Sequence, residues 1–150
     1  MRRLTTRSFE PRNPDFENRV RENFHRQTAM KTFGITIGKI ESGLVELEMP
    51  FNPVFTQQHG FMHAGIITTG IDTACGYAAF TLMEEGAEVL TVEFKTNFVA
   101  PATGEKFRFC GEVLKQGKTI TVTEGKVYAV SQGTEKLVAS MSATMMAVRG

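Results

Sequence analysis

The stretch QQHGFMHAGIITTGIDTACGYAAFTLMEE, from Gln57 to Glu85, decides how the chain folds. Residues 61–83 form a run of 23 residues that carries a single formal charge, Asp72. A run this apolar is either a membrane span or a helix surrounded by protein. A carboxylate at the centre of a bilayer helix costs about 3 kcal/mol, and threonine, histidine and glycine dilute the segment further. We therefore expect a helix buried within a folded domain.

Small residues dominate this predicted helix. Gly70 and Gly76 each cost a helix about 1 kcal/mol relative to alanine, so close packing should compensate for them. The other small residues are Ala64, Gly65, Ala74, Ala78 and Ala79. A helix with so little side-chain volume can lie close against a sheet.

Asp72 is the residue of this helix that packing does not explain. A buried carboxylate must be paired, hydrogen-bonded or shifted in pKa. No lysine or arginine lies within four residues of Asp72. A carboxylate surrounded by isoleucine, alanine and glycine would have its pKa raised, so Asp72 is our first candidate for chemistry.

The residues before this helix predict a covering helix and a hairpin. Asn13-Pro14-Asp15 is a typical helix start, and the apolar residues recur every four positions, which predicts an amphipathic helix over residues 14–30. Two short strands, GITIGKI and LVELEMP, flank a turn at residues 41–43. Residues 1–13 are expected to be a mildly basic, solvated tail, and residues 14–150 a single domain.

After the helix the apolar period changes to two. In the run from Val89 to Val99, the side chains of Leu90 and Phe94 are predicted to face one way and Thr91 the other. Three further strands follow at about 105–115, 119–130 and 137–148, joined by short turns, which predicts an antiparallel meander. The fold class is α+β: a curved antiparallel sheet of about six strands around one long helix.

Composition excludes several classes of function. The formal charge of +1 gives no reason to expect nucleic acid as a partner. There is no apolar signal-peptide core, so we expect a cytoplasmic protein with no membrane partner. Cys75 and Cys110 lack paired spacing and are expected to be reduced, and no metal site or cofactor is expected.

The segment HAGIITTGIDTA, residues 63–74, resembles the HGG-x-x-x-x-x-x-D signature of hotdog-fold acyl-CoA thioesterases. The likeness is to the PaaI-like branch of the 4-hydroxybenzoyl-CoA thioesterase superfamily, and it extends from about residue 34 to residue 148. It implies a hotdog fold, subunits joined edge to edge through their sheets, and hydrolysis of an acyl-CoA thioester at the subunit interface. The expected assembly is a homodimer, with a homotetramer left open.

The resemblance assigns roles to particular residues. Asp72 matches the carboxylate that acts as general base or nucleophile, and Ala64 stands where relatives have a glycine whose N–H binds the oxyanion. Gln57 matches a polar position that orients the nucleophile or water, a part that Gln58 would take if the register shifts by one. Thr91 falls where relatives place a Ser or Thr that assists the water.

Further positions carry weaker assignments. His63 is expected either to cap the helix or to take part in catalysis, and Gln57 is equally well explained as a loop hydrogen-bonder. Gly65 is expected to offer a second N–H to the substrate. Substrate contacts are also expected from Phe61, Met62, Lys115 and Lys118, with Phe80 and Met83 setting pocket depth.

Helix geometry adds an independent constraint. The nine residues from His63 to Asp72 span about 13.5 Å along a helix and place the two on opposite sides of it. If both ends of this segment act on one carbonyl, two subunits must contribute. Two alternatives to a thioesterase remain open: a non-catalytic hotdog module that binds acyl-CoA, and a hotdog dehydratase or hydratase acting on hydroxyacyl or enoyl thioesters.

Overall fold

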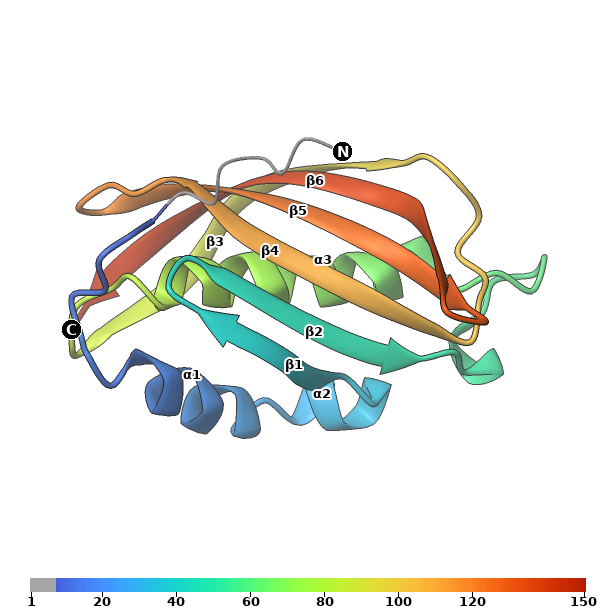
Figure 1. The fold of residues 1–150 in the computed structure, drawn as a ribbon, viewed down its shortest axis with the longest axis horizontal. Helices are drawn as coiled ribbons and strands as arrows, with labels where there is room; N and C mark the ends of the chain where they lie inside the picture. Colours follow the sequence, from blue (N-terminus) through green and yellow to red (C-terminus); the bar gives the residue numbers. More distant parts are fainter. Residues whose placement is uncertain (1–7) are drawn as a thin grey trace.

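A computed structural model describes residues 8–150 as a curved antiparallel sheet wrapped around one long helix (Figure 1). This confirms the predicted α+β architecture with six strands. The helices are α1 (Phe16–His25), α2 (Thr28–Phe33) and α3 (Ala64–Phe80), with a short 3-10 turn at Pro53–Phe55. The strands are β1 (Thr36–Glu41), β2 (Leu44–Pro50), β3 (Ala87–Phe98), β4 (Lys106–Lys115), β5 (Ile120–Ser131) and β6 (Thr134–Arg149).

The strand order is β1-β2-β4-β5-β6-β3, so the predicted meander is correct for β4 to β6 and wrong for β3. The chain leaves β3 and crosses the end of the sheet before entering β4. On this path the N–H of Val99 donates to the carbonyl of Val138 in β6, and the N–H of Glu105 donates to that of Val130 in β5. As a result β1 and β3 are the two edge strands of the sheet.

A β-bulge at Val92 changes which face the residues of β3 occupy. Thr91 lies opposite Met145 and Phe94 lies opposite Ala143, and both partners are buried on the concave face. Thr91 and Phe94 therefore share the face that looks toward α3, and the predicted strict alternation through this strand is wrong. The extra residue inserted by the bulge turns the Thr91 side chain toward the helix.

The helix α3 lies in close contact with the sheet. A Cβ atom added to Gly70 would lie 2.4 Å from the ring of Phe109 in β4, and one added to Gly111 would lie 2.4 Å from backbone atoms of Ala74. A Cβ added to Gly76, in contrast, would meet nothing within 4 Å. Close packing thus explains Gly70 but not Gly76.

The predicted N-terminal helix over residues 14–30 is in fact two helices. Helix α1 ends at His25, and Gln27 adopts an extended backbone with φ −80° and ψ 104° before α2 begins. Val20 and Phe24 of α1 are buried, as their spacing predicted. The interruption places the Gln27 side chain next to α3, where it donates a hydrogen bond to the hydroxyl of Tyr77.

Part of the predicted tail can be placed. Phe9 packs against a small apolar cluster of Ala78, Leu82 and Val113, and its carbonyl accepts a hydrogen bond from the Ser42 hydroxyl. Residues 1–7, which hold most of the predicted basic arm, lie outside the described residues. Between residues 8 and 150, no helix is both long and apolar enough to cross a bilayer.

Replacing each helical glycine with alanine separates packing from helix propensity. We expect Gly70→Ala to destabilise the fold by about 1–3 kcal/mol, because the fully buried Phe109 ring has no free space to move into. Gly76→Ala should stabilise it by about 0.5–1 kcal/mol, because the methyl group lies in open space and alanine favours the helix. Denaturant unfolding of both variants measures the difference. Equal effects for the two would contradict the close contact between α3 and β4.

Candidate functional site

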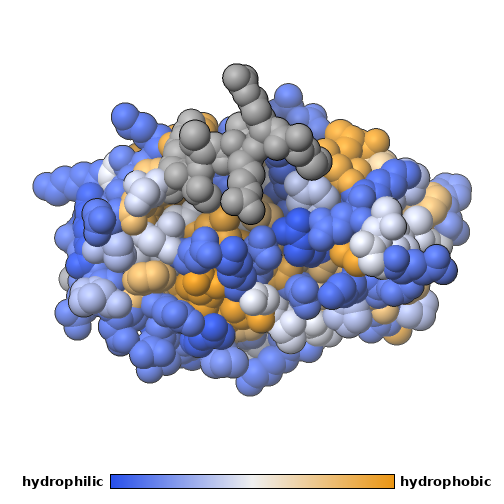
Figure 2. Space-filling model, viewed as in Figure 1, coloured by the Kyte–Doolittle hydropathy of each residue, from blue (hydrophilic) through white to orange (hydrophobic). Residues whose placement is uncertain are grey.

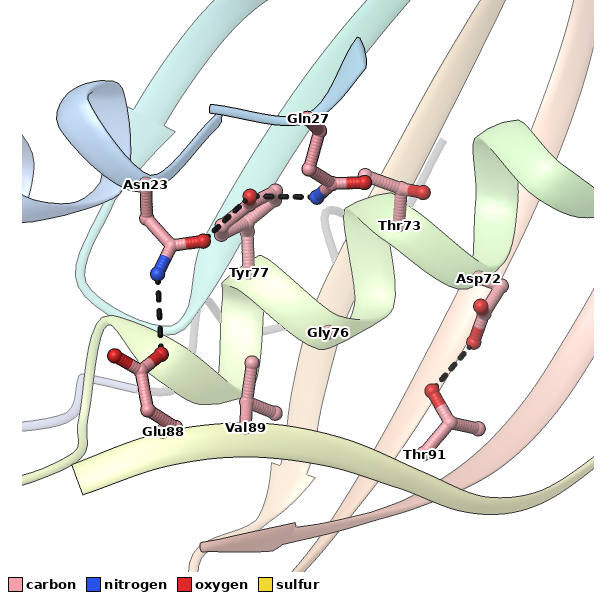
Figure 3. A pocket seen from close by; sticks show the side chains of 9 residues that line it. All are labelled: Asn23, Gln27, Asp72, Thr73, Gly76, Tyr77, Glu88, Val89 and Thr91. Carbon is pink, nitrogen blue, oxygen red and sulfur yellow. Dashed lines mark hydrogen bonds between the residues drawn. The ribbon is translucent and has the colours of Figure 1, made fainter. Parts of the chain in front are cut away.

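A cavity of about 250 Å³ lies where α1, α3 and β3 meet (Figure 3). It is lined by Asn23, Gln27, Asp72, Thr73, Gly76, Tyr77, Glu88, Val89 and Thr91. Two of the predicted site residues, Asp72 and Thr91, therefore line the same cavity although they come from a helix and a distant strand. The open space above Gly76 forms part of the cavity, which gives that glycine a role that helix packing did not supply.

Asp72 is half-buried in this cavity, and its carboxylate oxygen Oδ1 accepts a hydrogen bond of 2.8 Å from the Thr91 hydroxyl. Burial raises the pKa of Asp72 above that of an ordinary aspartate, and the hydrogen bond from Thr91 opposes part of that rise. No lysine or arginine is among the described residues that line the cavity. The sequence-based expectation of a raised pKa thus agrees with the structure, and such a carboxylate suits proton abstraction near neutral pH.

The other end of the cavity holds a chain of polar side chains that the sequence analysis missed. Gln27 Nε2 donates to the Tyr77 hydroxyl at 2.6 Å, and that hydroxyl donates to Asn23 Oδ1 at 2.9 Å. Asn23 Nδ2 in turn donates to Glu88 at 3.1 Å. Asn23 and Gln27 are four residues apart in the sequence and lie beside the buried Phe24. This pair of polar residues along a core-facing stripe was the sequence signal that could have indicated the polar chain.

The start of α3 is capped by His63. Its backbone has φ −59° and ψ 136°, and its ring Nδ1 accepts a hydrogen bond of 2.9 Å from the N–H of Gly65. The interpretation of His63 as a helix cap is therefore confirmed, and the N–H of Gly65 is already engaged. The N–H of Ala64 has no acceptor among residues 8–150, so it is the donor at this end that a ligand could use.

The remaining predicted residues lie away from the Asp72 cavity. Gln57 Oε1 accepts hydrogen bonds from the backbone N–H groups of His59 and Phe61, so within this chain it stabilises its own loop. Met62 is buried in the core and only 3% exposed. The expected CoA contacts, Lys115 and Lys118, are exposed at the β4–β5 connection.

The two halves of the predicted site are far apart within one chain. Helix α3 begins at Ala64 and runs without a break past Asp72, which was the assumption behind the two-subunit argument. Eight residues of α-helix separate Ala64 from Asp72 by about 12 Å along the axis. A single chain therefore does not bring the free N–H and the carboxylate to one reacting carbon.

A curved antiparallel sheet wrapped around one long helix is the hotdog fold, and its helix here carries a half-buried carboxylate beside an edge strand. Residues 59–136 match the family model of the Thioesterase superfamily. The chain belongs to this superfamily, which confirms the resemblance to hotdog-fold thioesterases.

Individual proteins agree with this assignment. Acyl-coenzyme A thioesterase 13 of Homo sapiens is 31% identical in an alignment of length 126 that covers 80% of this chain and 88% of that protein. The crystal structure of a thioesterase family protein from Silicibacter pomeroyi is 53% identical, with a TM-score of 0.89 over 90% of this chain and 99% of that one. The PaaI protein of E. coli, from the phenylacetic acid degradation operon, has a TM-score of 0.81 at 20% identity, with coverage of 91% and 95%, and shows the shared fold.

The environment of Asp72 predicts a pH-dependent cost to stability. The pKa of Asp72 is higher in the folded than in the unfolded state, so folding favours the protonated carboxyl. The free energy of unfolding is therefore larger at low pH, and this gain is lost as pH rises through the folded-state pKa. Asp72→Asn keeps the shape but not the charge, so at pH 7 it should unfold at a higher denaturant concentration than wild type. The difference should shrink as pH falls toward about 4, the ordinary aspartate value.

The matched control is Asp15→Asn, which changes the other aspartate of the chain, an exposed residue at the start of α1. Urea unfolding of all three proteins from pH 4 to pH 8, at one fixed protein concentration, measures the effect. A loss of stability in Asp72→Asn at neutral pH would show that the ionised carboxylate stabilises the fold and would refute this account.

Proposed function

We propose that the protein is a thioesterase that hydrolyses acyl-CoA to a carboxylic acid and free CoA. The observation that carries the proposal is Asp72, a half-buried carboxylate with a raised pKa that accepts a hydrogen bond from Thr91, in a cavity that no lysine or arginine of residues 8–150 lines. Such a group stays available as a base or nucleophile, whereas a carboxylate clamped by arginine does not. The name of the human relative, acyl-coenzyme A thioesterase, supports the choice of acyl-CoA as substrate class.

The reaction follows from the chemistry of the thioester. The Asp72 carboxylate takes a proton from a water molecule whose oxygen attacks the carbonyl carbon, and the carbon–sulfur bond then breaks. The proton passes to the departing CoA thiolate, so that the products are the acid and the thiol. In the alternative route the carboxylate attacks the carbonyl carbon itself, and the carbon–sulfur bond breaks to give an anhydride and CoA thiolate. Water then hydrolyses the anhydride to the acid and the Asp72 carboxylate, and the proton released goes to the thiolate. Neither route needs a metal or a redox cofactor.

The negative charge that develops on the carbonyl oxygen requires a donor, and the N–H of Ala64 is the candidate. Because Ala64 lies about 12 Å along α3 from Asp72 of its own chain, the donor is the partner subunit's Ala64. The free edge of β3 supports such a dimer. Large apolar side chains along this edge are 43% to 58% exposed: Leu90, Val92, Phe94 and Phe98 of β3, and Val99 just after it. An unpaired apolar edge strand of this length favours pairing with a second copy.

The other assignments remain predictions within this proposal. Lys115 and Lys118 are candidates for the CoA phosphates, Gln57 for orienting the nucleophile or water, and Phe61 for a contact with the substrate. The cytoplasmic location and the number of subunits beyond two also stay predictions.

Thiol release from acyl-CoA tests the proposal. We expect Asp72→Asn to lower kcat/KM by about 10²–10⁴-fold, which is the range for loss of a general base. Asp15→Asn should retain wild-type activity. A thiol-reactive dye reports free CoA from a panel of acyl-CoAs, and mass spectrometry reports the acid. Saturable binding without thiol release would instead identify a non-catalytic acyl-CoA module, and interconversion of hydroxyacyl and enoyl thioesters would identify a dehydratase or hydratase.

The shared site can be tested by mixing two inactive chains. Ala64→Pro removes the N–H at the first position of the helix, where proline is tolerated, and the extended backbone of His63 suits a residue before proline. Homodimers of Ala64→Pro and of Asp72→Asn should both have little activity. Their purified heterodimer contains one intact site, so it should recover about half of the wild-type kcat per dimer.

A chain with both substitutions, paired with a wild-type chain, is the control for this experiment. That pair has no site with both groups intact if the subunits share the site, so it should be nearly inactive. Half activity for this control, with none for the first heterodimer, would show that each chain carries a complete site and would refute the shared arrangement.

A further inference from the structure

A second cavity lies on the other side of α1 from the Asp72 cavity. Its volume is about 510 Å³, within the range of small-molecule sites, whereas the Asp72 cavity at about 250 Å³ is below it. It is lined by Arg21, Phe24, His25, Gln27, Met30, Lys31, Gly34, Ile35, Thr36 and Ile37. The three basic residues among these are exposed, and the buried residues are apolar.

The inner wall of this second cavity is apolar. Figure 2 shows hydrophobic surface in the region where β1 lies beside α1 in Figure 1. The buried walls are formed by Phe24, Met30 and Ile35, with Ile37 partly buried. In contrast, the far end of the Asp72 cavity is closed by amide, phenol and carboxylate groups. An unbranched hydrocarbon chain fits the second cavity better than the polar end of the first.

The wall between the two cavities is thin. Gln27 lines both of them, and the rings of Phe24 and Tyr77, one lining each cavity, have centroids 5.9 Å apart. The Gln27 side chain is held by the hydrogen bond from its Nε2 to the Tyr77 hydroxyl. The Gln27 side chain makes no capping hydrogen bond to α2, so its rotation breaks the bond to Tyr77 and leaves the helix start unchanged.

The positions of Asp72 and Gly76 along α3 define a path for an acyl group. A thioester carbonyl beside Asp72 would leave the acyl group free to run over Gly76, one helical turn further on, where nothing occupies the space of a side chain. Beyond Gly76 the path reaches Tyr77 and the Gln27 that donates to it (Figure 3). The length available to an acyl group thus ends at Gln27.

We propose that Gln27 is the partition that sets acyl-chain length: it closes the Asp72 cavity to short acyl groups and, when displaced, opens it into the apolar cavity between α1–α2 and β1. This proposal rests on the proposed thioesterase function only in placing the thioester carbonyl beside Asp72. Its ligand is an unbranched acyl-CoA.

Equilibrium binding tests the partition without requiring turnover. Butanoyl-CoA and dodecanoyl-CoA are titrated by calorimetry into Asp72→Asn and into Asp72→Asn carrying Gln27→Ala. Gln27→Ala should tighten binding of dodecanoyl-CoA by about tenfold or more, because additional methylene groups reach apolar walls, and should change binding of butanoyl-CoA by less than about twofold. In the chain with native Asp72, the same substitution should shift the kcat/KM optimum toward longer acyl groups.

Two controls separate the partition from general loosening. Gln27→Met keeps the volume of the side chain and should retain the short-chain preference. Glu22→Ala truncates an exposed residue of α1 that lines neither cavity, and it should leave the binding of both ligands unchanged. Equal tightening of both ligands by Gln27→Ala, or no change in either, would overturn the proposal even if thiol release is normal. Absence of thiol release from every acyl-CoA, with the selective tightening still observed, would refute the thioesterase proposal and leave the partition standing.

Discussion

The contact between α3 and the concave face of the sheet is the constraint on which the rest of the structure depends. Gly70 admits the Phe109 ring, and Gly111 admits the backbone of α3, so neither position has room for a methyl group. Such close approach packs the sheet-facing side of α3 as densely as a protein interior. It also fixes the rotation of α3 about its axis, because only one side of the helix presents Gly70 to β4. Asp72 and Gly76 are thereby turned to the side where α1 and β3 leave a cavity.

Most of this fold could be predicted from the sequence, because its helices, strands and turns depend largely on local residue patterns. The absence of charge around Asp72, the period-two runs and the turn residues predicted the helix, the strands and the hairpin, and the resemblance placed them in order. The position of β3 was not predictable from its own residues, because edge pairing with β6 is a contact between segments about 50 residues apart. The bulge at Val92 was missed for the same reason: it exists only relative to the partner strand.

The residues of the candidate site also differ in how far the sequence alone could identify them. Asp72 could be found because an unpartnered acid in an apolar helix is conspicuous in any single sequence. Asn23 and Gln27 gave only a weak signal, their spacing of four beside Phe24, because polar residues on an amphipathic helix normally face water. The tertiary contact with Tyr77 is what distinguishes them. For His63 and Gln57 the sequence left two interpretations open, a catalytic one and a structural one. Both match motif positions, but in this chain their side chains stabilise the helix start and the loop before it.

An ionisable group at this position has a cost in stability that the proposed function accounts for. A neutral amide would fit the space beside Thr91 with less desolvation, so a carboxylate there lowers stability at neutral pH, and under the proposal it does so in exchange for reactivity. The unpaired β3 edge is a second cost, because its exposed apolar side chains promote association. Formation of the proposed dimer reduces both of these costs. Burying the β3 edge removes the exposed surface, and the same contact brings a free helix N-terminus to a carboxylate that its own chain leaves without a donor for the oxyanion.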